Sequence, residues 1–350
     1  MAKPPSSAIG VDLGRHSMKA VLLQRKGSKL ALNRFATREL SAEIQTLDLL
    51  AANLKALLQE LGGSAKACAI AVSSGESFIR IVEQPEMPRE TLRDALRFNS
   101  QALLNMDGRD FVLDCDRISA PRPPAGGIAG GSLAAGEAVR YLVGGLPRTQ
   151  VQMIHEAGAK MKLPIASLQL SPVAVFNAFE YSHEETFNTQ GFVLVDIGHR
   201  SSEVIVGAKR ELILARSLDY GGNQFVDELI CHGASGPEEV AQALAEEEVL
   251  TIENARLSLT ELVRSISSSI GFVEARHDEA IPRVFVSGGM AKSPAILRIL
   301  SEELQLPCET WNPFAGCELA LPAAKKDALG TEAPGLCAAF GAAAEILKGS

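Results

Sequence analysis

An apolar strand that ends in an aspartate and a glycine turn occurs twice in this chain, and this repeat constrains the fold more than any other feature. The first copy is IGVDLG at residues 9–14, and the second is VLVDIG at residues 193–198. An apolar stretch typical of a returning strand follows each copy. The repeat therefore predicts two related halves, each opening with a strand, an Asp-x-Gly turn and a second strand.

The similarity between the two copies extends through the turn and into the returning strand. Backbone N–H groups in such a turn can surround an anion. An aspartate just before the turn can hold Mg²⁺, usually through water. Two turns of this kind that face each other would bind a nucleotide phosphate chain from both sides. The aligned residues are Asp12 with Asp196, Gly14 with Gly198, Ser17 with Ser201, and Leu30 with Leu214.

Further candidates for a phosphate site lie near these turns. Lys19 can reach a phosphate as a point charge, although a solvated strand lysine is an equally good interpretation. Gly288 and Gly289 follow a buried strand and precede a helix, where a ligand can approach the backbone closely. The alternative for this pair is an ordinary strand-to-helix turn. Gly221 and Gly222 give a weaker signal, because they also fit a simple helix start.

Bulky side chains stand in both turns where a phosphate loop usually carries small ones. Arg15 and His16 lie in the first turn, and Arg200 lies in the second. They either add positive charge toward a phosphate or block it. His16, His199 and His232 show no metal-ligand spacing, so surface or boundary histidines are the better interpretation.

Composition excludes several classes of protein. With 350 residues and 46% hydrophobic content, the chain can form two domains with a sizeable core. The net charge of -8 argues against nucleic acid, and no Lys/Arg run suggests an anionic membrane surface. No stretch is long and apolar enough to span a bilayer, and residues 1–7 do not resemble a signal peptide. The six cysteines form no Cys-x-x-Cys pair, which favours reduced thiols in a cytosolic protein.

The order of the expected elements favours an α/β fold with mixed sheets covered by helices. We predict a first half at 8–84, 164–189 and 333–350, an inserted α+β subdomain at 85–163, and a second half at 190–332. The elements expected in the first half and the insertion are a hairpin at 8–35, helices at 47–61, 91–104 and 149–160, strands at 68–72, 78–82, 111–116 and 141–144, and a flexible connection at 121–138.

Helix starts are predicted from capping residues. Ser171 precedes Pro172, a pair that suits a cap followed by the first helical turn. Ser235 and Glu238 have the spacing of a capping box. A long helix is expected at 251–276 from its apolar periodicity.

These turns, in this order, resemble those of the actin-like ATPase superfamily, which includes actin, heat-shock chaperone ATPases, sugar kinases and FtsA. Residues 12–19 are similar to its first phosphate motif, residues 196–198 to the second, and residues 286–290 to its adenosine motif. Within the superfamily, the insertion and the carboxy-terminal part resemble the PilM family of type IV pilus assembly proteins. The segments that carry this closer likeness are residues 87–90, Asp114, and residues 141–160, 288–307, 311–314 and 333–341.

The resemblance implies duplicated actin-like (ribonuclease H-like) domains around a nucleotide cleft that binds ATP and Mg²⁺. It implies a cytoplasmic scaffold of a type IV pilus or type II secretion-like machine, peripheral to the inner membrane. The cytoplasmic tail of an inner-membrane PilN-like protein would dock near the insertion. The resemblance leaves open a pilus assembly ATPase as a second partner, and self-association into a homo-oligomer.

One departure from the superfamily bears on catalysis. Related ATPases place Glu or Gln at the start of the helix between the halves, whereas Ser171 stands there in this chain, with Gln169 just before it. Because serine is too short to orient the attacking water, we expect very slow hydrolysis or none. The alternatives are an active ATPase, either an FtsA-like filament protein or a phosphotransferase, and a pseudo-ATPase with an empty cleft. No aspartate base can be assigned for a phosphotransferase, and the alanine-rich segment 338–347 does not resemble an FtsA-like membrane helix.

Overall fold

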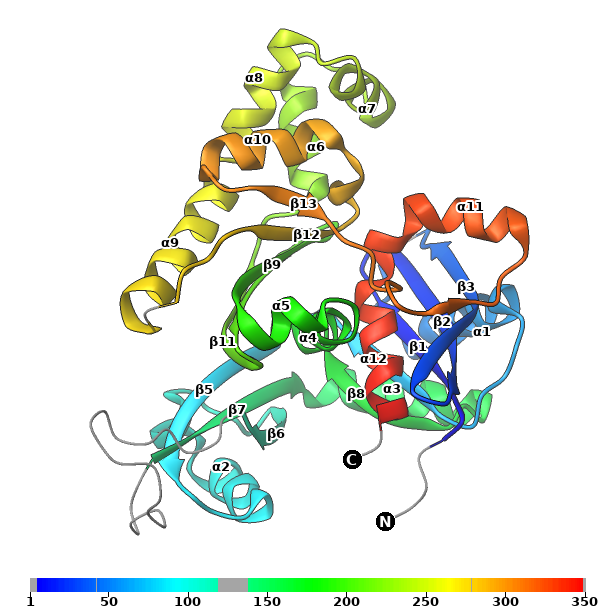
Figure 1. Ribbon diagram of the computed structural model, residues 1–350. Coiled ribbons are helices and arrows are strands. Elements are labelled where there is room, and N and C mark those ends of the chain that lie inside the picture. Colours follow the sequence, from blue (N-terminus) through cyan, green and yellow to red (C-terminus); the bar gives the residue numbers. More distant parts are fainter. Residues whose placement is uncertain (1–4, 42, 119–137, 278, 349–350) are drawn as a thin grey trace.

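The computed structural model describes residues 5–41, 43–118, 138–277 and 279–348. Two larger parts, each with a sheet and its own helices, lie on either side of a pair of central helices, and a smaller part projects below them (Figure 1). Of the flexible connection expected at 121–138, residues 121–137 lie outside the described residues.

The two large sheets repeat one strand order, which confirms the predicted α/β class and its duplication. In each sheet the strand that carries the aspartate is central, antiparallel to the returning strand on one side and parallel to a later strand on the other. The six-stranded sheet has the order β14 (Glu318–Leu319), β3 (Lys29–Glu39), β2 (Ser17–Lys26), β1 (Ser7–Leu13), β4 (Cys68–Val72) and β8 (Ile165–Leu170). The five-stranded sheet has the order β11 (Glu211–Leu218), β10 (Ser202–Ala208), β9 (Gly191–Ile197), β12 (Val284–Gly288) and β13 (Cys308–Thr310).

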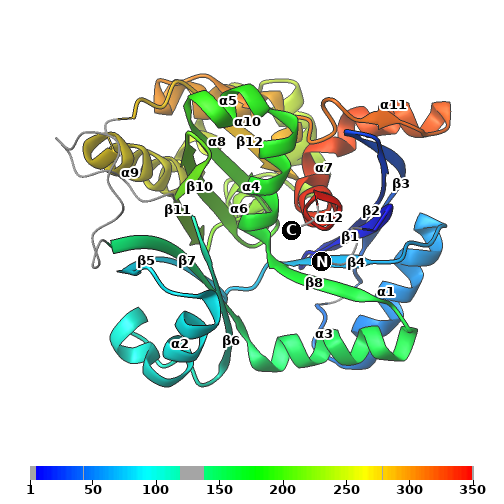
Figure 2. The same cartoon turned by 60° about the horizontal axis from the view of Figure 1, so that its bottom comes forward.

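The smaller part contains a three-stranded antiparallel sheet and the helix α2 (Figure 2). Leu92 and Leu96 of α2 are buried against Tyr141 and Val143 of the central strand. The limits of the halves and of the insertion remain predictions. The elements here are β5 (Phe78–Pro85), β7 (Ala138–Pro147), β6 (Phe111–Arg117), α2 (Arg89–Leu104) and, after β7, α3 (Arg148–Met161).

Three helix predictions need correction. The long helix expected at 251–276 is two helices, the first ending at Ser258 and the second beginning at Thr260, and they meet at the fully buried Leu259. Both turn apolar side chains into the second-half core. Ser171 is the first residue inside its helix, and Leu170 occupies the cap position without a side-chain hydrogen bond. The expected capping box is absent, since Gly236 is the cap residue and Glu239, not Glu238, accepts the N–H of Ser235.

The remaining helices cover the sheets. Thr46 caps α1 and Gly62 ends it in a left-handed conformation, as the predicted boundary requires. These helices are α1 (Leu47–Leu61), α4 (Ser171–Ser182), α5 (Glu184–Thr189), α6 (Gly222–Cys231), α7 (Pro237–Ala245), α8 (Val249–Ser258), α9 (Thr260–His277), η1 (Met290–Lys292), α10 (Pro294–Leu304), α11 (Ala323–Glu332), η2 (Ala333–Leu336) and α12 (Cys337–Lys348).

The helices α4 and α12 lie side by side and join the two halves (Figures 1 and 2). One buried cluster contains residues of both large sheets together with residues of these two helices. The backbones meet directly, because a β-carbon at Gly341 would lie 1.7 Å from the carbonyl oxygen of Ala174. A β-carbon at Gly10 of β1 would lie 1.9 Å from the carbonyl oxygen of Ala339. Glycine at both positions therefore sets the spacing between α12 and its neighbours.

Replacing Gly341 with alanine tests this spacing. The added methyl group must push α12 away from α4, so we expect Gly341→Ala to lower the free energy of unfolding by about 1–3 kcal/mol. Gly271 is the matched control, since it also lies inside a helix but has nothing within 4 Å of its β-carbon position. Gly271→Ala should raise stability by about 0.5–1 kcal/mol. Urea unfolding measures both, and equal effects of the two substitutions would contradict the close contact.

Candidate functional site: the cleft between the two glycine turns

A cavity of about 400 Å³ lies where the central strands of the two large sheets end. This is the position at which open α/β sheets bind ligands, outside the carboxyl ends of their strands. Ser171 lies at its wall, whereas Gln169 and Gly221 do not line it. The predicted site residues that line it are Asp12, Gly14, Ser17, Lys19, Asp196, Gly198, Ser201, Gly222, Gly288 and Gly289.

Two aspartates and a lysine form a charged group in this cleft. Asp12 and Lys19 are cross-strand partners, and the Lys19 Nζ lies 3.2 Å from Asp12 Oδ2. Burial opposes the charge on Lys19, but attraction to Asp12 and to Asp196 outweighs it and raises the pKa of the ammonium. Burial has the opposite effect on the acid: it raises the pKa of Asp196, although the Ser287 hydroxyl donates a 2.7 Å hydrogen bond to this carboxylate. Lys19 thus supplies a fixed positive charge between carboxylates from both halves.

The two Asp-x-Gly turns close in the same way. A β-carbon at Gly14 would lie 2.5 Å from the carbonyl oxygen of Ser17, and one at Gly198 would lie 2.8 Å from that of Ser201. In the second turn the Gly198 N–H donates to this Ser201 carbonyl at 3.0 Å. Both turns therefore require glycine to close so tightly.

Gly288 and Gly289 form part of the cleft wall. Gly288 has φ +88°, and a β-carbon there would lie 2.3 Å from the carbonyl oxygen of Ile197, so only glycine fits between the neighbouring strand ends. Gly289 has no atom within 4 Å of its β-carbon position. A ligand can therefore come close to the backbone at Gly289.

The glycines at the start of α6 support the second turn. The N–H of Gly222 donates to the carbonyl of Gly198 at 2.9 Å, and the N–H of Asn223 donates to that of His199 at 2.8 Å. A β-carbon at Gly221 would lie 2.5 Å from the His199 carbonyl oxygen. These two N–H groups hold the turn in place and are not free to bind an anion.

The bulky residues of the turns meet across the cleft. The rings of His16 and His199 stack with centroids 4.3 Å apart and planes inclined by 22°. Arg200 forms an ion pair with Glu43 of the first half at 3.1 Å. Both histidines are exposed, and no group of three or more His, Cys, Asp or Glu that could hold a metal ion occurs in the described part of the chain. A metal bound by Asp12 and Asp196 would therefore need ligand oxygens and water to complete its coordination.

One acidic residue of the cleft, Glu203, is not among the predicted site residues. Glu203 is the cross-strand partner of Asp196, as Lys19 is of Asp12. Glu203 is therefore the second-half equivalent of Lys19. It lines the cleft, is 8% exposed, and accepts a 2.9 Å hydrogen bond from the Ser217 hydroxyl. Burial raises the pKa of its carboxyl to about 8. The alignment of the two copies already covers this position, seven residues beyond each aspartate, but a carboxylate opposite a lysine gave no signal of a shared role.

Gln169, the other candidate beside Ser171, is engaged elsewhere. Its amide N–H donates to the carbonyl of Ala342 at 3.3 Å, and its oxygen accepts from Asn177 at 3.4 Å. The Gln169 side chain therefore points toward α4 and α12.

The raised pKa of Glu203 predicts a pH dependence of stability. Between its ordinary value near 4.5 and about 8, the folded chain binds a proton that the unfolded chain has lost. Stability therefore falls as pH rises through this window, by at most about 1.4 kcal/mol per unit. Glu203→Gln carries no titrating proton, so its stability relative to the native chain should rise from pH 5 to pH 8. Urea unfolding across this pH range measures the stability of both chains, and Glu83→Gln, at an exposed glutamate, is the control. Parallel curves of stability against pH for the native chain and Glu203→Gln would contradict the burial of a neutral acid.

The duplicated sheets, joined at a cleft that glycine turns line from both sides, define the actin-like ATPase fold. The family model of the type IV pilus assembly protein PilM matches residues 148–346. Since the match spans more than half of the chain, this protein belongs to the PilM family. No curated protein sequence gives a significant match.

Solved structures of low sequence identity share the fold. A structure of a PilM–PilN type IV pilus biogenesis complex has 20% identity and a TM-score of 0.79, covering 97% of this chain and 98% of that one. The nucleotide-free diol dehydratase-reactivating factor has 8% identity and a TM-score of 0.57, covering 98% and 100%. MreB 5 of Spiroplasma citri, bound to AMPPNP, has 12% identity and a TM-score of 0.51, covering 96% and 94%. Among the described residues, no helix is long and apolar enough to cross a membrane.

Proposed function

We propose that this chain is a cytoplasmic scaffold of a type IV pilus or type II secretion-like assembly machine. It sits at the inner membrane by holding the cytoplasmic tail of a PilN-like membrane protein. The observation that carries this proposal is the match to the PilM family over residues 148–346. The likeness in fold to a PilM–PilN complex along 97% of the chain supports it.

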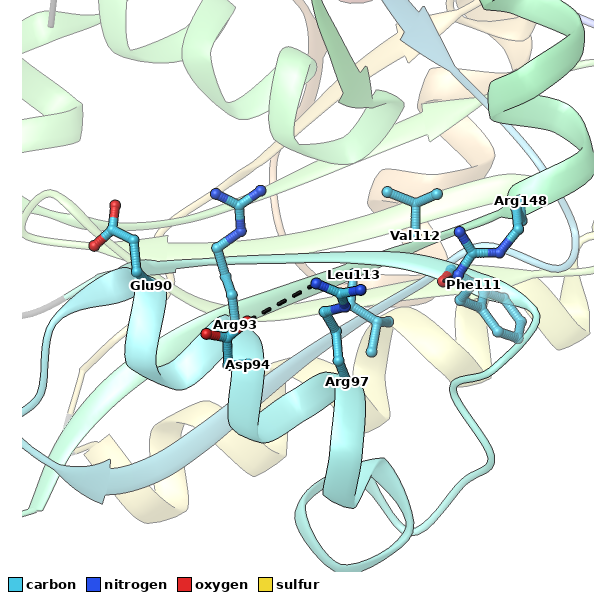
Figure 3. Close-up of a pocket in the computed structure, with 8 residues that line it drawn as sticks. All are labelled: Glu90, Arg93, Asp94, Arg97, Phe111, Val112, Leu113 and Arg148. Carbon is cyan, nitrogen blue, oxygen red and sulfur yellow. Dashed lines mark hydrogen bonds and ion pairs between the residues drawn. The ribbon is translucent and has the colours of Figure 1, made fainter.

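The tail docks on the inserted subdomain, in a groove between α2 and β6. The groove encloses about 370 Å³, and Figure 3 shows Arg93 and Arg97 projecting from α2 beside the strand that carries Val112 and Leu113. Arg97 is 71% exposed, and its ion pair with Asp94 is long, at 3.9 Å. Its charge is therefore largely available to a ligand. Apolar side chains beside these guanidinium groups suit a peptide with both apolar and acidic residues.

The strand β6 gives the tail a backbone partner. It pairs with β7 on one side only, at the edge of the three-stranded sheet in the described part of the chain. An extended peptide can add to such an edge through main-chain hydrogen bonds, while the adjacent groove selects its side chains. A single short peptide binds modestly, so firm attachment requires several copies in one assembly.

Charge reversal on α2 tests this docking site. Arg93→Glu with Arg97→Glu should weaken binding of a synthetic PilN-like tail peptide at least ~10-fold, because it replaces attraction with repulsion. Lys55→Glu with Lys66→Glu is the matched control, since both lysines are exposed and lie outside the groove. Fluorescence anisotropy of a labelled peptide measures the affinity. Equal affinity for the two double variants would refute docking in this groove.

The cleft binds ATP with Mg²⁺ weakly. Its size is in the range of small-molecule ligand pockets, Lys19 offers a charge to a phosphate, and the space before Gly289 admits a ligand. Asp12 and Asp196 can each accept a hydrogen bond from a water molecule bound to Mg²⁺. The metal ion would in turn neutralise phosphate charge. The short Ser171 and the engaged Gln169 leave neither side chain placed to orient water, so hydrolysis is very slow or absent.

Added nucleotide should stabilise the fold. A ligand that binds only the native state adds about 2.7 kcal/mol at a hundred times its Kd. We expect the melting temperature to rise when millimolar ATP and Mg²⁺ are added, and Asp12→Asn or Asp196→Asn to abolish the rise. Asp327→Asn, an exposed aspartate on α11, should keep it. An unchanged melting temperature of the native chain in differential scanning fluorimetry would favour an empty cleft.

A further inference from the structure

The stacked histidines occupy the gap between the two glycine turns. His16 lies between Gly14 and Ser17 in the first turn, and His199 follows Gly198 directly in the second. Each ring therefore belongs to a different half of the molecule. With centroids 4.3 Å apart, the rings are in contact and span the cleft from one turn to the other.

A second contact between the halves holds the rings in this position. Arg200, the neighbour of His199, pairs with Glu43 ahead of α1 at 3.1 Å, with both side chains about two-fifths exposed. In the first turn, the Arg15 guanidinium lies against the loop at Gly75, 3.2 Å from the position that a β-carbon of residue 75 would occupy. The arginines thus reach outward to the first half, while the imidazoles between them meet over the cleft.

This arrangement limits the room available to a phosphate chain. Phosphates that pass between the turns need the space in front of the turn backbone, and small residues usually leave that space clear. Here the paired rings fill part of it, and separating them would lose their stacking and strain the Arg200–Glu43 pair. A shorter chain can end at the rings and accept a hydrogen bond from an imidazole N–H.

We propose that His16 and His199 set the length of the phosphate chain that the cleft accepts, so that a nucleoside diphosphate binds more tightly than the matching triphosphate. The inference rests on the proposed binding of nucleotide in this cleft. It makes the two histidines specificity-determining residues, in keeping with the weak ATP binding proposed above.

Isothermal titration calorimetry with ADP and with ATP, each with Mg²⁺, tests the proposal on the full chain. The native protein should bind ADP at least ~10-fold more tightly than ATP. In His16→Ala with His199→Ala the gap is clear, so the ratio of the two dissociation constants should fall toward one. The matched control is His155→Ala with His232→Ala, which removes two exposed histidines that do not line the cleft and should leave the ratio unchanged.

The ratio is taken within one protein, so a loss of fold stability in a variant does not alter its meaning. A native ratio near one, or a ratio that survives removal of His16 and His199, would overturn the proposal while nucleotide binding stands. Failure of the native chain and of the double variant to bind either nucleotide at millimolar concentration would instead reject the proposed nucleotide function, and this inference with it.

Discussion

The contact of α12 with α4 and β1 fixes how the halves of this molecule meet. Gly341 lets the backbone of α12 approach that of α4, and Gly10 lets it approach the first sheet. Side chains of both large sheets pack into the same core as these helices. Since packed interiors do not deform continuously, this spacing brings the ends of β1 and β9, with their glycine turns, to the same cleft. The geometry of the cleft therefore depends on two glycines that do not line it.

Within the cleft, the duplication places unlike charges at equivalent positions. Lys19 follows Asp12 by the same interval as Glu203 follows Asp196, and each is the cross-strand partner of its aspartate. The first half thus gains a cation that remains charged, while the second half holds a carboxyl whose burial favours the neutral form. The net effect is a cleft less negative than its acidic residues suggest, which suits an anionic ligand.

Local features of the fold could be predicted from the sequence because short-range physics determines them. The strands around Asp12 and Asp196, the α1 boundaries and the glycine turns all follow from apolar patterning and backbone sterics. The break at Leu259 could not be predicted, since the apolar pattern continues through it and Leu259 itself packs into the core with residues of both helices.

The cleft was predictable in its glycine and aspartate residues but not in its side-chain contacts. The stack of His16 on His199 and the ion pair of Arg200 with Glu43 join residues more than a hundred positions apart. Such pairs depend on how the two halves are positioned relative to each other, and a local sequence pattern does not contain that information. Glu203 differs, because its position was implicit in the repeat and its role became visible only once β10 was seen to bury it.

We propose that the two turns act together on one phosphate chain, and a crystal structure of the protein grown with ADP and Mg²⁺ is the sharpest test of this. We expect phosphate oxygens between residues 14–17 and residues 198–201, within hydrogen-bond distance of backbone N–H groups from both turns. Nucleotide bound to one turn only, or bound outside the cleft, would contradict it.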